Sequence, residues 1–164
     1  MADLRVELYG EVVGHLVGTD RRSFDFVAID NAIETFGLGS TILSESVPFD
    51  LVANRAKAGR RRNFFVELLP EGTALDNLAA QIRVSPDDVI PLLAQFGRDV
   101  AGAVQIYDPT AADEPRTPSL TTVDGIGIGK MLANTQAAPL GNRPKTGRTS
   151  LAGVQDKIVV ARMK

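Results

Sequence analysis

The stretch LRVELYGEVVGHLV, residues 4–17, decides the fold of this chain. Leu4, Val6 and Leu8 alternate with other residues, which is the period-2 pattern of a strand that buries one face. A tight turn at Gly10-Glu11 and the run Val12–Val17 then predict the return strand of a hairpin. The chain is therefore expected to begin with an antiparallel sheet that has one apolar face.

Two more segments have strand patterns. Ser23–Ile29 alternates again, which predicts a third antiparallel strand, and Gly102–Tyr107 predicts another strand later in the chain. Between them, the region 30–50 mixes glycine, serine and short apolar pieces. We expect loops there, with a short helix near Ala32–Phe36 and an extended piece at Val47–Phe49.

The middle of the chain predicts three helices. The first spans Phe64–Leu69, whose dense apolar residues are expected in the core, and it ends before a proline. The second spans Thr73–Arg83 and opens on a threonine–aspartate capping box. The third spans Ser85–Phe96, with serine as its cap, proline as its first residue and two aspartates at the positive end of the helix dipole. Gly97 is expected to end it.

These elements predict an α+β fold over residues 1–108, a small antiparallel sheet with helices packed on it. Residues 109–149 have the composition of a linker and are expected to be partly flexible. One weak helix is expected within Thr122–Gln136, where Gly125–Lys130 lacks the spacing of a dinucleotide-binding loop. Residues 150–164 predict a loop and one trailing strand.

Composition places the chain among ordinary globular proteins. Of its 164 residues, 44% are hydrophobic and 23% are charged, enough for a core without metals or disulfides. Cys is absent and His15 is the single histidine, which excludes thiol catalysis and argues against zinc. The apolar stretches are too short to span a membrane, and a net charge of −2 gives no global attraction to nucleic acid or lipid. We therefore expect a cytoplasmic protein without membrane contact.

The segment Ser150–Lys157, SLAGVQDK, carries the clearest chemistry. Glycine and small side chains leave backbone N–H groups free to surround an anion, and the lysine adds a point charge. The candidate phosphate-binding residues are Ala152, Gly153, Val154, Gln155, Asp156 and Lys157. The spacing is not that of a Walker A loop, and an ordinary turn before an edge strand is the alternative.

Three strings occur in order along the chain, LLPEG at residues 68–72, GRDVAGA at 97–103 and SLAGVQDK at 150–157. Together with the opening hairpin and Ser46–Phe49, they resemble the N-terminal part of HipA-like serine/threonine protein kinases, the toxins of bacterial toxin–antitoxin pairs. The resemblance implies a small subdomain packed on a kinase core that uses ATP and Mg²⁺. It also implies that Ser150–Lys157 covers ATP and that Ser150 is the autophosphorylated residue.

The catalytic lysine, the acid and the Mg²⁺ ligands of such kinases would lie beyond Lys164. The resemblance therefore implies no catalytic or metal site within residues 1–164, and no ATP or Mg²⁺ bound to them alone. A truncated kinase is favoured, with the missing kinase core and a HipB-like antitoxin as partners. The alternatives are a stand-alone, non-enzymatic regulatory or antitoxin-like subunit of a split kinase system, and a helix-turn-helix-like module associated with DNA.

Three further features bear on partners and packing. The candidates for weak contact with nucleic-acid phosphates are Arg55, Lys57, Arg60, Arg61 and Arg62. A solvated loop is the alternative for this basic run. Residues 73–96 imitate a helix-turn-helix, but Asp87 and Asp88 at the start of the second helix would repel DNA, and packing inside the subdomain is the alternative. Arg98 and Asp99 are expected to tie down the turn after that helix.

Overall fold

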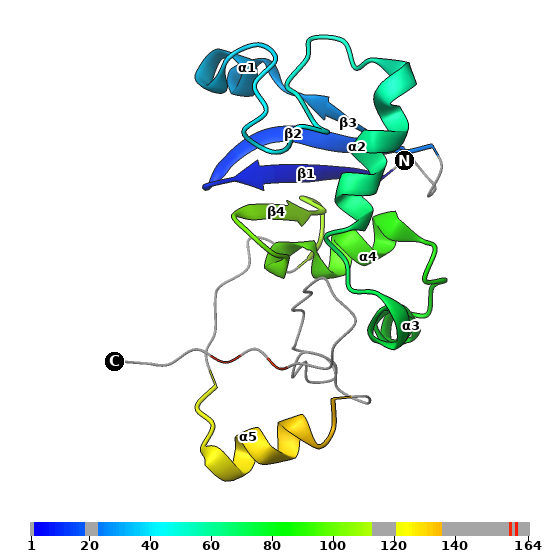
Figure 1. Ribbon diagram of the computed structural model, residues 1–164, viewed down its shortest axis with the longest axis vertical. Helices are drawn as coiled ribbons and strands as arrows, with labels where there is room; N and C mark the ends of the chain where they lie inside the picture. The colour runs from blue at the N-terminus through cyan, green and yellow to red at the C-terminus, as the bar shows by residue number, and fades with distance from the viewer. Residues whose placement is uncertain (1, 19–22, 113–120, 136–157, 159, 161–164) are drawn as a thin grey trace.

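The computed structural model describes residues 2–18, 23–112, 121–135, 158 and 160, and these form an α+β fold with one four-stranded sheet (Figure 1). The strands are β1 (Ala2–Leu8), β2 (Glu11–Gly18), β3 (Asp25–Ala28) and β4 (Val104–Tyr107). The α-helices are α1 (Asp30–Phe36), α2 (Ala58–Val66), α3 (Gly72–Ile82), α4 (Val89–Phe96) and α5 (Gly125–Leu132). Two short 3₁₀ turns are η1 (Arg55–Lys57) and η2 (Gly97–Asp99). The predicted fold class is confirmed.

The sheet has the strand order β3-β2-β1-β4, and every neighbouring pair is antiparallel. The predicted hairpin of β1 and β2 is present, but its turn is Tyr9-Gly10, one residue earlier than expected. Both residues have positive φ, 55° and 88°, as a two-residue hairpin turn that matches the strand twist requires. A register shift after Val6 leaves Val13 of β2 as the extra residue of a bulge.

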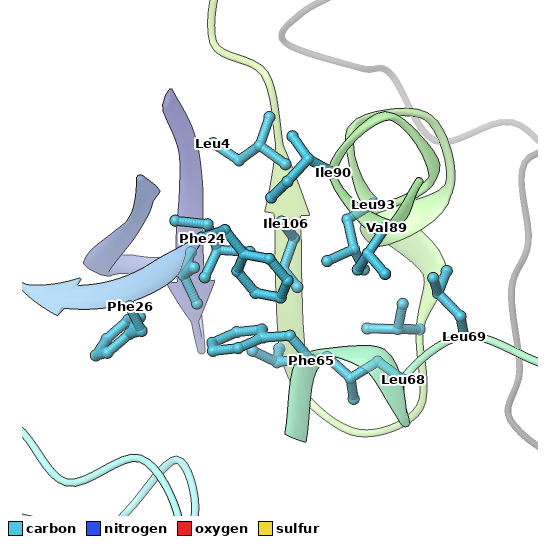
Figure 2. Close-up of a cluster of buried hydrophobic side chains, with 14 of the residues drawn as sticks. Leu4, Phe24, Phe26, Phe65, Leu68, Leu69, Val89, Ile90, Leu93 and Ile106 are labelled. Carbon is cyan, nitrogen blue, oxygen red and sulfur yellow. The ribbon is translucent and has the colours of Figure 1, made fainter. Parts of the chain in front are cut away.

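The core lies on one face of this sheet. Leu4, Val6 and Leu8 are all buried there, so the predicted alternation of β1 is confirmed. Helices α2 and α4 cover this face (Figure 1). Figure 2 shows Leu4 of the sheet beside Ile90 of α4, in a cluster that also holds Phe65 of α2, and all three side chains are buried. Because a half-apolar sheet cannot leave this face in water, the two helices are an integral part of the fold.

Two helix boundaries differ from the predictions. The predicted helix Phe64–Leu69 is wrong in its limits, because α2 begins at Ala58 and ends at Val66. The proline at position 70 disfavours helical backbone at the residue before it, and the two leucines of that run are buried beyond the helix end. Helix α4 begins at Val89 rather than at Ser85, since Ser85–Asp88 forms a turn of its own.

The expected helix caps are also wrong. In the turn before α4, the Ser85 N–H donates to Asp88 Oδ2 at 3.1 Å and the Asp87 N–H donates to Ser85 Oγ at 3.2 Å. These side chains satisfy the turn, and no side chain caps α4. Helix α3 begins at Gly72 after Glu71, again without a side-chain cap, so the expected capping box is not formed.

Gly97 follows the last residue of α4, as predicted, but for a different reason. Its φ is −70°, so it is not the left-handed glycine that commonly ends a helix. A Cβ at this position would lie 2.6 Å from the carbonyl oxygen of Ile106 in β4. Glycine therefore allows the end of α4 to approach the backbone of the sheet.

The weak helix expected in the linker is present as α5. Its N-cap is Asp124, whose Oδ1 accepts a hydrogen bond from the Gly127 N–H at 2.7 Å. No residue of α5 is buried, and Figure 1 shows it apart from the sheet. The predicted trailing strand falls outside the described residues, except for Ile158 and Val160.

The close approach at Gly97 predicts the effect of a single methyl group. Gly97→Ala places a carbon against backbone that cannot rotate away, and we expect it to lower the free energy of unfolding by about 1–3 kcal/mol. Gly59→Ala, in α2, is the matched control, because its Cβ meets only the end of the Arg62 side chain at 4.0 Å. It should stabilise by ~0.5–1 kcal/mol through helix propensity. Urea unfolding measures both, and equal effects would contradict the packing argument.

Candidate functional site

The candidate ATP loop, Ser150 and Ala152–Lys157, lies outside the described residues. Its assignment therefore still depends on its residue types. Across residues 2–18, 23–112 and 121–135, no group of three or more His, Asp or Glu side chains is placed to hold a metal ion.

The string LLPEG at residues 68–72 has a packing role. Leu68 and Leu69 are buried in the core between α2 and α4 (Figure 2). Glu71 is exposed at the N-cap of α3, and Gly72 begins that helix with a φ of 58°. The leucines anchor the connection and the glycine permits the change of direction.

The string GRDVAGA at residues 97–103 also holds the fold together, mainly through Arg98. Its guanidinium carbon lies 3.4 Å from the centroid of the Tyr107 ring, in a cation–π contact. Its Nη1 donates to Gln105 Oε1 at 2.9 Å and lies 3.5 Å from Glu7 Oε2. Arg98 thereby joins η2 to β4 and β1, and its expected structural role is confirmed.

The basic run does not form a solvated loop, because it continues from η1 into α2. Arg61, predicted to be available to phosphates, is only 2% exposed. Its Nε and Nη2 donate to the two carboxylate oxygens of Asp25 at 2.7 and 2.6 Å, and Nη2 also donates to the Asn54 carbonyl at 2.9 Å. Arg61 is therefore part of the core, and its assignment to a nucleic-acid contact is withdrawn.

The hydrogen-bonded Asp25 carboxylate raises the pKa of Arg61 above its ordinary value, against burial, which lowers it. The planar guanidinium is well suited to a bidentate hydrogen bond with a carboxylate. This pairing compensates the desolvation cost of burying the arginine charge. Sequence reasoning missed this pair. Arg61 lies four residues before the buried Phe65, on the same face of α2, and this spacing was the signal for it.

The other basic side chains of the run remain near the surface. Arg62 is half-buried and its Nη1 lies 3.5 Å from the Phe24 carbonyl. Arg55, Lys57 and Arg60 are exposed. Any phosphate contact by this run therefore falls to these three side chains.

The helix pair α3 and α4 does not have the exposure that a DNA-reading helix needs. Five of the eight residues of α4 are buried, and its apolar face packs on the sheet. Asp87 and Asp88 are exposed just before its first residue, where phosphates would approach. The alternative interpretation, packing inside the subdomain, accounts for this pair.

A family model described as HipA N-terminal domain matches residues 4–107, which is more than half of the chain. The chain belongs to the HipA N-terminal domain family. The matched range runs from Leu4 in β1 to the end of β4, so it contains nearly all of the sheet and α1–α4. The resemblance predicted from the hairpin and the three strings is confirmed.

Two proteins of Sinorhizobium fredii are similar to this chain. "Putative kinase Y4dM" is 30% identical over 156 residues, covering 94% of this chain and 34% of that protein. "Putative kinase Y4mE" is 35% identical over 123 residues, covering 71% of this chain and 28% of that protein. The chain thus spans about a third of the length of the curated relatives that it matches.

Membrane insertion through a helix has no support in the described ranges. The helices there are too short and insufficiently apolar to reach across a bilayer.

Replacing Arg61 should destabilise the fold far more than replacing its neighbour. Arg61→Ala leaves the Asp25 carboxylate without its partner in a largely buried site, and we expect a loss of about 3–5 kcal/mol of unfolding free energy. Arg61→Lys should cause an intermediate loss of unfolding free energy, because an ammonium group cannot form the bidentate hydrogen bond. Arg60→Ala removes an exposed side chain and should change stability by about 0.5 kcal/mol or less. Equal losses for Arg61→Ala and Arg60→Ala in urea unfolding would refute the role of the pair.

Proposed function

We propose that this chain acts as the N-terminal part of a HipA-like serine/threonine protein kinase, the toxin of a type II toxin–antitoxin pair. The main support is the HipA N-terminal domain match over residues 4–107, joined to a relative named as a kinase whose similarity covers 94% of the chain. That coverage is too long to fit within residues 4–107, so it reaches beyond the domain toward the candidate ATP loop.

The ATP loop of this kinase would be Ala152–Lys157. Its glycine and small residues suit backbone contacts to phosphate oxygens, and Lys157 supplies a positive charge. Asp156 beside it weakens the local positive field. ATP with Mg²⁺ is the proposed cofactor of the whole enzyme. The residues that would hold Mg²⁺ and activate the attacking hydroxyl are assigned to the catalytic part by the resemblance to HipA-like kinases.

Ser150 is the proposed site of autophosphorylation. A phosphoserine carries about −1.5 to −2 charge and three acceptor oxygens. It would compete with the ATP phosphates for the same backbone donors and repel them, which would turn the kinase off. The proposed partners are a HipB-like antitoxin and the catalytic core, in the cytoplasm.

The described domain supports a positioning role rather than a catalytic one. Buried Arg61 is engaged with Asp25, and partly buried Arg98 is engaged with Tyr107 and Glu7. Its part in the kinase would be to pack on the catalytic core and to lead the chain into the ATP loop.

Phosphate mapping tests this proposal. When residues 1–164 are joined to a catalytic part, incubation with ATP and Mg²⁺ should place phosphate on Ser150, detected by mass spectrometry. Ser150→Ala should abolish that phosphopeptide, whereas Thr149→Ala, one residue earlier, should keep it. Residues 1–164 alone should incorporate no phosphate. Phosphate transfer by residues 1–164 alone, or a longer protein unmodified at Ser150, would argue against the proposal.

A further inference from the structure

The segment Leu51–Arg62 contains five Lys or Arg residues and no Asp or Glu. The structure divides these cations into two groups, because Arg61 is bonded to Asp25 and Arg62 is half-buried. The exposed group is Arg55, Lys57 and Arg60. In the part of the chain that the structure describes, no carboxylate forms an ion pair with any of the three.

The orientation of α2 fixes the exposure of these cations. Arg61 and Phe65 lie one turn apart and both point into the core, so the rotation of α2 is set by two buried anchors. Successive residues of a helix are about 100° apart, which turns Arg60 toward solvent. The cations also surround the N-terminal end of α2, where the helix dipole is positive. Asp50, the acid that precedes this segment in the sequence, interacts electrostatically with Arg61.

The loop that leads into η1 and these cations carries exposed apolar side chains. Leu51 is 68% exposed and Val52 is 84% exposed, although both are large and aliphatic. Leu38, 64% exposed, comes from the other arm of the same loop. Backbone hydrogen bonds of 2.8 and 3.0 Å join Gly39–Ser40 to Phe49, which holds the two arms together. The loop 37–54 and the start of α2 that follows it therefore carry both exposed aliphatic side chains and cations that pair with no carboxylate among the described residues.

This combination fits a protein better than a nucleic acid. Phosphates would engage the cations alone, and bases are bound mainly by aromatic stacking or polar contacts, which leucine and valine do not offer. Protein interfaces instead combine an apolar centre with arginine. Charge complementarity then requires carboxylates on the partner.

We propose that this region is a docking surface for an acidic segment of a partner protein whose other side is apolar. The surface consists of Leu38, Leu51, Val52, Arg55, Lys57 and Arg60. Its aliphatic side chains would be buried by the partner's apolar side, and its cations would pair with the partner's carboxylates. The inference is independent of whether Ser150 is phosphorylated.

The test measures binding of residues 1–164 to a short fluorescein-labelled helical peptide with leucine on one face and glutamate on the other. Arg55→Glu/Lys57→Glu/Arg60→Glu should weaken binding roughly tenfold or more, about 1.4 kcal/mol, through lost charge pairs. Leu51→Ser/Val52→Ser should weaken it by a similar factor through lost burial. The same peptide with glutamine in place of glutamate should bind as weakly, and added salt should reduce binding of the acidic peptide.

Matched control variants distinguish the effect of this surface from general effects of net charge and surface hydrophobicity. Arg5→Glu/Arg83→Glu/Lys130→Glu makes the same change in net charge elsewhere, and Ile126→Ser/Leu132→Ser removes exposed apolar side chains from α5. Both should bind the peptide as the unaltered chain does, and thermal unfolding should show every variant folded. Absence of peptide binding at low salt, or equal losses in the control variants, would overturn the proposal. So would tighter binding of a short DNA duplex that Leu51→Ser/Val52→Ser does not affect, since the surface would then be a nucleic-acid contact.

Discussion

The burial of one face of β1 is the constraint on which the rest of the structure depends. β1 is an interior strand, paired with β2 on one side and β4 on the other, and its alternate residues Leu4, Val6 and Leu8 all face the core. Those side chains need a cover, which α2 and α4 provide (Figure 2). β4 lies about a hundred residues after β1 in sequence, and its pairing with β1 brings η2 and the end of α4 against the edge strand of the sheet.

Charged side chains inside this domain support its architecture. Arg61 bonds a strand to a helix through Asp25, and Arg98 ties η2 to two strands. Removing Arg61 is costly because the Asp25 carboxylate would lose its partner in a site with little access to water. Two of the three strings that mark the family, LLPEG and GRDVAGA, are thus explained by packing. The third string, SLAGVQDK, lies outside the described residues, and its role in phosphate binding is a proposal.

Much of the site could not be predicted because burial is decided by distant residues. Arg60, Arg61 and Arg62 are consecutive residues of the same type, and residue type alone does not distinguish them. Arg60 is nevertheless exposed, Arg61 is buried and Arg62 is half-buried. The difference comes from the rotation of α2 and from Asp25, 36 residues earlier. The helix limits show the same effect. Ser85–Asp88 has every local signal of a helix start, but its side chains satisfy a turn and α4 begins only where its apolar residues reach the sheet.

The sequence by itself determined the α+β class, the opening hairpin and the family, because alternation and turn residues act between near neighbours and the three strings are read directly. It also named Ser150 and Ala152–Lys157 as the chemical candidates. Only the tertiary structure decided which arginine enters the core, why position 97 must be glycine, and which cations of the basic run stay exposed. Those properties depend on contacts between segments far apart in the chain, and a local pattern carries no record of such contacts.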